Sequence, residues 1–332
     1  MSFLHKAQPR VALLGECMVE LQQRADGNLV QAFGGDTLNV AVYLARLCGD
    51  SSIVDYVTAL GDDDLSGAMR ACWREEGVSD TQTRTLAGLL PGLYLIQTDA
   101  AGERRFLYWR TASAARHCFD GAEGDVLLKR LASYDVIYLS GISLAILSDE
   151  GRARLLSGLR QCRENGVRIV FDNNYRPRLW RSLDEARLHH RAVLAMTDLA
   201  LVTWEDDAAL FGLSTTDALF EMYEDLGVSE IALKRGHQAC LLNSPHGIIE
   251  VPTERVDTVI DTTAAGDSFS AAYLACRLSG GSSELAARWG HRLAGAVIGH
   301  PGALIPRKAM PVMPLLTSMI LCLPQRPDYE DY

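Results

Sequence analysis

The chain has 332 residues, of which 48% are hydrophobic, enough apolar material for one large core. Its formal net charge of −10 disfavours nonspecific binding to nucleic acid or anionic lipid, both of which need a basic surface. The eight cysteines are scattered, with no Cys-x-x-Cys pair and no His/Cys cluster, so we expect reduced thiols, no disulfide and no zinc site.

The two ends of the chain predict a cytoplasmic protein without membrane contact. Residues 1–10 are polar and lack the apolar stretch of a signal peptide. The longest apolar run near the other end, Leu315–Leu323, is much shorter than the roughly 20 residues that span a bilayer.

The first elements are an apolar strand over Val11–Leu14 and a hairpin. Met18–Leu21 and Leu29–Phe33 flank Ala25-Asp26-Gly27-Asn28, and an Asp-Gly pair is typical of a tight hairpin turn.

Small and polar residues then lead into a helix predicted over Val40–Leu47. Gly34 and Gly35 allow the backbone to approach a ligand closely. Asp36 and Asn39 add short polar groups at the helix start, an arrangement that can bind a polyol. Taken alone, the same residues are more typical of a Gly-Gly turn with an Asp cap.

Further along, apolar β-rich runs alternate with helical periods. This alternation predicts a parallel sheet covered by helices on both faces, a Rossmann-like α/β fold of the αβα sandwich type. Strands are expected at Ile53–Thr58, Val136–Leu139, Ile169–Phe171, Leu199–Val202 and Ile231–Leu233, and helices at Leu65–Glu76, Asp149–Asn165 and Asp206–Phe211.

A second hairpin interrupts the alternation, with Leu93–Thr98 and Arg104–Arg110 flanking a turn at 99–102 that contains Gly. Together the two hairpins predict a small β-sheet apart from the main body. Surface hairpins without a role are the alternative, but the second one carries Tyr94 and Tyr108.

Arg110 and Arg176 are the two cations that we expect near a substrate carboxylate. A planar guanidinium stays charged and can bind a carboxylate through two hydrogen bonds, so the pair indicates an acidic ligand. A surface ion pair is the alternative for either arginine.

Residues 261–269, Asp-Thr-Thr-Ala-Ala-Gly-Asp-Ser-Phe, are the most informative segment. A turn of small residues runs into a helix that begins near Gly266, so the backbone N–H groups there attract an anion. Asp267 would take the proton from an acceptor hydroxyl while the amides of Ala264, Ala265 and Gly266 hold the charge on a transferred phosphoryl group. An ordinary capped helix is the alternative.

The pairing of Gly-Gly-Asp-x-x-Asn at 34–39 with Asp-Thr-x-x-Ala-Gly-Asp at 261–267 resembles the ribokinase-like (PfkB) carbohydrate kinases, and the likeness runs from about residue 11 to about residue 309. Within the family it is greatest to kinases of the sugar acid 2-keto-3-deoxygluconate. Stretches that carry this closer likeness are 15–18, 90–94, 108–110, 139–143 and 171–180.

The resemblance implies a kinase domain over residues 1–312 and a separate tail over 313–332. The small sheet, formed by about 17–33 and 91–111, would be a lid over the sugar and a contact for a homo-oligomer. We expect the apolar half of the tail to pack on a subunit and Pro324–Tyr332 to lack fixed structure.

The implied reaction is phosphorylation of O6 of 2-keto-3-deoxy-D-gluconate by ATP with Mg²⁺, with Asp267 as the general base. The partners would be the sugar acid and ATP. The resemblance assigns the substrate to Gly34, Gly35, Asp36, Asn39, Tyr94, Tyr108, Arg110 and Arg176, and ATP to Asn174, Arg176, Lys234, Arg235, Gly236 and the amides of Ala264, Ala265 and Gly266.

No protein residue is expected to bind the magnesium ion directly, because Mg²⁺ in such sites binds through phosphates and waters. The Asn-x-x-Glu motif of many family members is replaced by Thr203-Trp204-Glu205-Asp206, which leaves Glu205 or Asp206 as water-mediated support.

Several alternatives stay open. A kinase for fructose, ribose or a deoxy-keto inositol derivative would not need the arginine pair. A catalytically silent sugar or nucleotide sensor would lack Asp267. For Lys234-Arg235-Gly236 the alternative is a charged hairpin turn, and Asp172 could be a structural cap.

Overall fold

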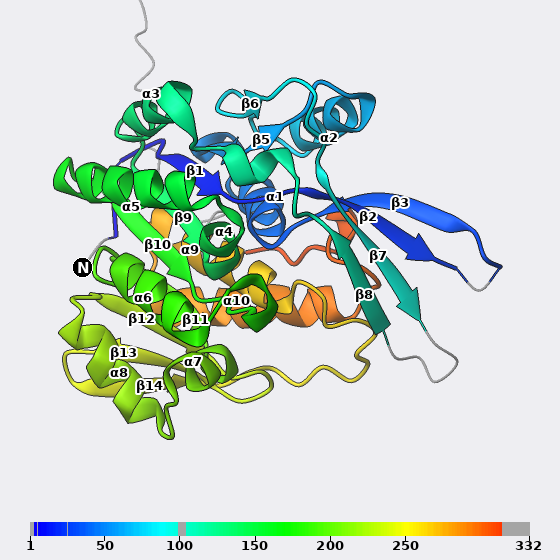
Figure 1. Ribbon diagram of the computed structural model, residues 1–332. Helices are drawn as coiled ribbons and strands as arrows, with labels where there is room; N and C mark the ends of the chain where they lie inside the picture. The colour runs from blue at the N-terminus through cyan, green and yellow to red at the C-terminus, as the bar shows by residue number, and fades with distance from the viewer. Residues whose placement is uncertain (1–2, 5, 25, 99–103, 314–332) are drawn as a thin grey trace, which may run out of the picture.

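The computed structural model describes residues 3–4, 6–24, 26–98 and 104–313, and its centre is an eight-stranded sheet (Figure 1). The strand order is β14-β13-β12-β11-β10-β9-β1-β4. All neighbours from β12 to β4 are parallel, whereas β13 and β14 pair antiparallel at one edge. The strands are β1 (Arg10–Leu14), β4 (Ile53–Val57), β9 (Val136–Ser140), β10 (Arg168–Asp172), β11 (Leu199–Thr203), β12 (Glu230–Lys234), β13 (Cys240–Ser244) and β14 (Gly247–Val251).

The parallel strands are apolar on both faces because each face packs under helices. In β1, Val11 and Leu13 point into one core and Ala12 and Leu14 into the other. The predicted αβα sandwich is confirmed. One layer consists of α1 (Asp36–Cys48), α2 (Asp64–Glu75), α9 (Ala265–Leu278) and α10 (Ser283–Ile298), and the other of α3 (Gly121–Leu131), α4 (Gly141–Ile146), α5 (Asp149–Glu164), α6 (Leu183–Leu194), α7 (Trp204–Phe211) and α8 (Thr216–Asp225).

Two helices begin earlier than the sequence pattern indicated. The helix predicted from Val40 begins at Asp36, directly after Gly35. The helix predicted from Asp206 begins at Trp204, directly after strand β11. In both helices the first turn is mostly polar, so the helical spacing of apolar residues becomes visible in the sequence only after it. Both first turns belong to the candidate site described below.

The two predicted hairpins form a second sheet of four strands in the order β3-β2-β7-β8. Each hairpin is an antiparallel pair, and β2 and β7 join them in parallel. Figure 1 shows this sheet extending away from the main body. We call it the lid sheet; its strands are β2 (Met18–Gln23), β3 (Leu29–Gly34), β7 (Gly92–Thr98) and β8 (Arg104–Trp109).

Short elements complete the described part of the chain. They are the two-stranded pair β5 (Ala59–Leu60) and β6 (Arg84–Thr85), and the 3₁₀ turns η1 (Gly49–Ser51), η2 (Ala114–His117), η3 (Pro177–Leu179) and η4 (Arg307–Ala309).

A helix with the length and apolarity of a membrane span is absent from the described residues. The predicted tail over 313–332 lies outside these residues except for Met313, and so do the whole turn at 99–102 and Ala25 of the first turn.

Candidate active site

The parallel strands all end at one edge of the main sheet, and a cavity of about 460 Å³ lies there, bounded by the lid sheet. Ligands of open parallel sheets bind at this edge because loops and helix N-termini converge on it. Most of the predicted site residues line this cavity: Gly35, Asp36, Asn39, Tyr94, Tyr108, Arg110, Asn174, Arg176, Lys234, Ala264, Ala265, Gly266 and Asp267.

Three predicted site residues do not line it. Gly34 lies beneath Tyr94, and a Cβ built on it would be 2.4 Å from the tyrosine oxygen, so its small size allows the tyrosine to pack. The Arg235 side chain instead donates to the carbonyl of Ala239 at 2.8 Å. Gly236 lines a second cavity of about 660 Å³, which adjoins the first at Thr262 and Ala265.

The turn before α9 has the geometry expected of an anion site. Ala264 is the N-cap and has a left-handed backbone (φ 60°, ψ 16°), which turns the chain so that the helix N-terminus faces the cavity. A Cβ built on Gly266 would be 3.6 Å from Lys234 Nζ, so an ammonium group lies beside the same helix start.

Asp267 lies in the first turn of α9 with its carboxylate at the cavity. Its Oδ2 accepts a hydrogen bond of 2.8 Å from Asn39 Nδ2. Desolvation raises the pKa of Asp267 to about 7, and the negative charge of Asp36 adds to this effect, while the hydrogen bond from Asn39 acts against it. A carboxylate with this pKa can accept a proton near neutral pH.

Asp36 is fixed by two hydrogen bonds from the ends of neighbouring strands. Ser140 Oγ donates to Asp36 Oδ2 at 2.5 Å, and Asn174 Nδ2 donates to the same oxygen at 2.6 Å. Asn174 has a positive φ of 25°, and its N–H donates to Asn173 Oδ1 at 2.8 Å. Three segments far apart in the sequence therefore fix one carboxylate.

Lys234 ends β12 and is held by a buried acid at the end of β10. Its Nζ lies 2.7 Å from Asp172 Oδ2 and 3.2 Å from Ser270 Oγ. Asp172 is therefore the counter-ion of Lys234 and more than a strand cap. The pair keeps a cation at the cavity without leaving it uncompensated.

Arg176 is at the open side of the cavity. Its Nη1 lies 3.4 Å from both carboxylate oxygens of Asp206, and its side chain is 52% exposed. Burial raises the pKa of Asp206. Of the two acids considered near a magnesium ion, Asp206 lines the cavity and Glu205 is exposed.

A model of pfkB family carbohydrate kinases matches residues 8–310. The chain belongs to this family. Over 305 residues, 91% of this chain and 98% of the relative, it is 49% identical to the 2-dehydro-3-deoxygluconokinase of Dickeya dadantii (strain 3937). Over 306 residues, 91% of this chain and 99% of the relative, it is 46% identical to the 2-dehydro-3-deoxygluconokinase of Escherichia coli (strain K12).

A solved structure with the same fold is the aminoimidazole riboside kinase of Salmonella enterica, complexed with aminoimidazole riboside and an ATP analogue. The TM-score is 0.78 at 24% identity, and the match covers 94% of this chain and 99% of that chain. The predicted ribokinase-like fold of this pfkB family member is thus confirmed.

Two acidic residues at the lid side of this pfkB family site were not among the predicted site residues. Glu16, two residues after the end of β1, pairs with Arg110, and Glu20 on β2 accepts a hydrogen bond from the Tyr94 hydroxyl. Burial and the charge of Glu20 raise the pKa of Tyr94. Two sequence signals were available: Glu16 follows a buried parallel strand, and Glu20 alternates with the apolar residues of a strand.

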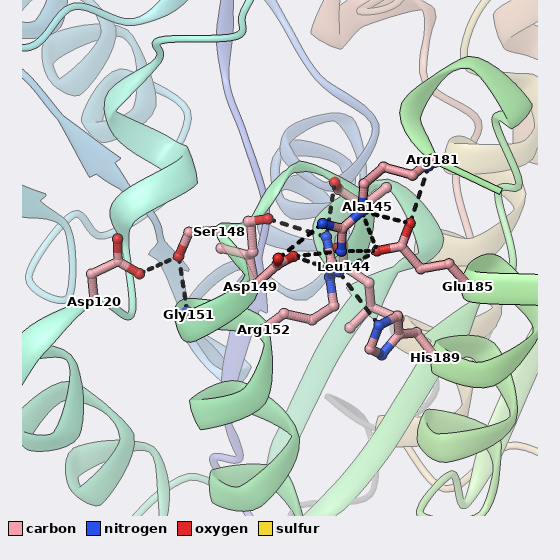
Figure 2. A network of polar contacts seen from close by, with 11 residues as sticks. Asp120, Leu144, Ala145, Ser148, Asp149, Gly151, Arg152, Arg181, Glu185 and His189 are labelled. Carbon is pink, nitrogen blue, oxygen red and sulfur yellow. Dashed lines mark hydrogen bonds and ion pairs between the residues drawn. The ribbon is translucent and has the colours of Figure 1, made fainter.

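A polar network holds the segment that follows Arg176, and Figure 2 shows its contact through Arg181, which donates to Glu185. The guanidinium of Arg152 lies 3.0 Å from Glu185 Oε1 and donates through Nε to the carbonyl of Leu144 at 2.9 Å. It also lies 5.2 Å from the ring of Trp180, which stacks on His189. This network joins α4, α5 and α6 and keeps the loop after β10 in place.

Proposed function

We propose that the protein is an ATP-dependent kinase that phosphorylates O6 of 2-keto-3-deoxy-D-gluconate, the acid also called 2-dehydro-3-deoxygluconate. The observation that carries the proposal is one cavity that holds both Asp267 at the start of α9 and the cations Arg110 and Arg176. Relatives at 46% and 49% identity that bear the name of this kinase support the same substrate.

In the proposed reaction, Asp267 accepts the proton of the O6 hydroxyl as the oxygen attacks the terminal phosphorus of ATP. The bond from that phosphorus to the bridging oxygen breaks, and ADP leaves with the bond's electron pair. The N–H groups at the start of α9, with Ala264, Ala265 and Gly266, face the negative charge on the transferred group. The ammonium of Lys234 adds positive charge on the same side. No covalent enzyme intermediate is needed, because positioning and electrostatic stabilisation carry phosphoryl transfer.

The sugar acid would occupy the lid side of the cavity. Asp36 and Asn39 offer acceptor oxygens for its hydroxyls, and Tyr94 and Tyr108 cover it from the lid. Its carboxylate would lie at Arg110 and Arg176, whose planar N–H groups match a carboxylate.

ATP would bind across the two adjoining cavities. Its phosphates fit near Asn174, Lys234 and the start of α9, with Arg176 at the open side, and its base fits the second cavity beside Gly236. The Arg235 side chain is left out of this proposal because it is bonded to Ala239.

Magnesium would arrive with ATP and neutralise phosphate charge. Among the described residues no three His, Cys, Asp or Glu side chains gather as a metal site. Asp206 is the carboxylate in a position to accept hydrogen bonds from such waters.

We also propose that two copies associate through the lid sheet. Leu21, Leu95 and Leu107 lie side by side in the strand register, and Trp109 follows on the same face, opposite to Tyr108. Trp109 is 57% exposed, as expected for a surface that a second copy covers. Light scattering should show a dimer that Trp109→Glu converts to monomer, whereas an unchanged mass would exclude this face.

A cytoplasmic location remains part of the proposal.

One assay tests the substrate directly. ADP release is measured with ATP and magnesium against 2-keto-3-deoxygluconate, its galacto epimer, fructose, ribose and gluconate. The proposal expects the highest kcat/KM for one or both keto-deoxy acids. A higher value for fructose or ribose would contradict it.

A further inference from the structure

Glu16 is a buried acid with no part in the proposed chemistry. It directly follows Gly15 at the end of β1, and it is 2% exposed. A carboxylate at this depth needs compensation, because burial of an unpaired charge is unfavourable.

Its two carboxylate oxygens face two partners. Oε1 accepts a hydrogen bond of 2.5 Å from Ser113 Oγ, and Oε2 accepts one from Arg110 Nη2. A Cβ built on Gly92 would be 2.7 Å from Oε1, so the acid fits closely against the start of β7. Glu16 therefore lies at the base of the lid sheet, between Gly92 at the start of β7 and Arg110, which follows β8.

Arg110 is only partly used by this pair. Its side chain is 13% exposed, and its Nε is buried without a hydrogen-bond partner in the described part of the chain. A guanidinium has five N–H groups in a rigid plane, so one that donates to Glu16 through Nη2 can bind a second carboxylate through its other N–H groups. The same side chain lines the cavity.

We propose that Glu16 is a positioning residue for acid recognition: it holds Arg110 by one nitrogen so that the remaining N–H groups meet the carboxylate of the sugar acid. The inference rests on the proposed function, because it requires an acidic substrate. Without Glu16, the guanidinium would lack a buried partner in the free enzyme and would rotate toward solvent, and binding of the acid would then have to reverse that movement.

A purely structural role for Glu16 is the rival explanation, since the contact with Ser113 ties the lid base to the main body. The two roles differ in what they change. If the role is structural, removal of Glu16 changes the kinetics with every substrate and lowers the thermal stability. If the role is positioning, its removal raises KM for the acid and leaves kcat nearly unchanged.

The test compares Glu16→Ala, Glu16→Gln and Ser113→Ala in the ADP-release assay, with the sugar acid and its carboxamide analogue as substrates. Loss of a hydrogen bond to a charged group in Glu16→Ala should raise KM for the acid about tenfold or more, with little change for the amide. Glu16→Gln keeps an acceptor for Arg110 and should stay near the parent. Ser113→Ala is the matched control for the lid tie and should also keep the parental KM.

Three outcomes would overturn the inference: equal KM increases for acid and amide, a parental KM in Glu16→Ala, or a loss in Glu16→Gln as large as in Glu16→Ala. Should Glu16→Ala not fold, Glu16→Asp draws the carboxylate back by one methylene and carries the same expectation. The parental enzyme separates the two proposals. If the parental enzyme uses the amide with the same kcat/KM as the acid, the proposed function fails too. If it prefers the acid but the Glu16 variants keep the parental KM, only the inference about Glu16 fails.

Discussion

The two sides of the cavity are built differently. On the sheet side, Asp36, Asp172 and Lys234 lie at helix or strand ends and have partners from other segments at 2.5–3.2 Å. On the lid side, Tyr108 is 54% exposed and Phe106 is 37% exposed, on a small sheet that extends from the body. The side chains proposed to orient phosphoryl transfer are thus on the more tightly held side, which also carries Asp36, whereas the tyrosines proposed to cover the sugar are on the less packed side.

This difference follows from burial. The ends of interior parallel strands cannot shift without disturbing both cores, so packing restrains the side chains there. The lid sheet has two edge strands and one face toward the cavity, so fewer contacts oppose its movement. The comparison predicts that changes on the sheet side reduce kcat, and that changes on the lid side alter recognition.

The largest effect is expected for Asp267→Asn. This variant keeps the shape of the side chain and can still contact Asn39, but it cannot accept the proton, so kcat should fall about 10²–10⁴-fold. Thermal stability and ATP affinity should change little. Asp225→Asn, an exposed acid on α8, is the control for the change in charge. Turnover of Asp267→Asn within a few-fold of the parent would show that Asp267 is not the base.

The second effect concerns acid selectivity. Arg110→Ala should weaken use of the sugar acid by about 2–5 kcal/mol in kcat/KM, the range for truncating a buried charge pair. Arg176→Ala should reduce kcat/KM for the acid by less, because the Arg176 side chain is 52% exposed and its charge is screened by solvent. Kinetics with the acid and a neutral sugar test this, with the exposed Arg105→Ala as the lid control. Equal losses on both substrates would exclude selectivity as the role.

The third effect is a pH dependence of the sheet side. Because the pKa of Asp267 is raised to about 7, the base is protonated below that pH and kcat/KM should fall about tenfold per pH unit in acid. Asp36→Asn removes a negative charge next to Asp267 and should move the midpoint of the pH–rate profile to lower pH, independently of its effect on the maximal rate. A flat profile between pH 6 and 8 would contradict this assignment.

The fourth effect distinguishes the two sides by hydrogen exchange. The sugar acid should slow amide exchange in 18–33 and 93–110 by about fivefold or more relative to ATP alone, because lid closure protects those strands. Val136–Ser140 in the main sheet should show no such difference between ligands. Protection confined to the region around Lys234 would mean that the lid sheet does not close on the sugar.

The smallest effect concerns strain at the anion site. Ala264 has a φ of 60°, a conformation that costs a non-glycine residue about 1 kcal/mol. Ala264→Gly should therefore raise the free energy of unfolding by up to about 1 kcal/mol. Ala209→Gly, at an exposed position in α7, should instead lower it by about 0.5–1 kcal/mol. Urea denaturation measures both, and destabilisation by Ala264→Gly would show that the strain is absent.

Part of the site could be predicted because its residues are contiguous in the sequence. The turn at 261–267 contains both the amides and the acid of the anion site, so its chemistry is local. Gly34 and Arg235 also belong to recognisable motifs, but Tyr94 covers Gly34, and the Arg235 side chain donates to the carbonyl of Ala239. Whether a side chain near a motif faces the ligand depends on neighbours that the motif does not contain.

The sequence by itself determined the alternating α/β architecture, the two hairpins and the small-residue turn at 261–267 before a helix, because period, turn residues and small-residue runs act over a few neighbouring positions. Only the tertiary structure decided which charges meet. Glu16 reaches Arg110 across 94 positions, and Asn39 reaches Asp267 across 228. Such pairs depend on the order of strands in the main sheet and on the position of the lid sheet relative to it, and no local sequence pattern specifies either.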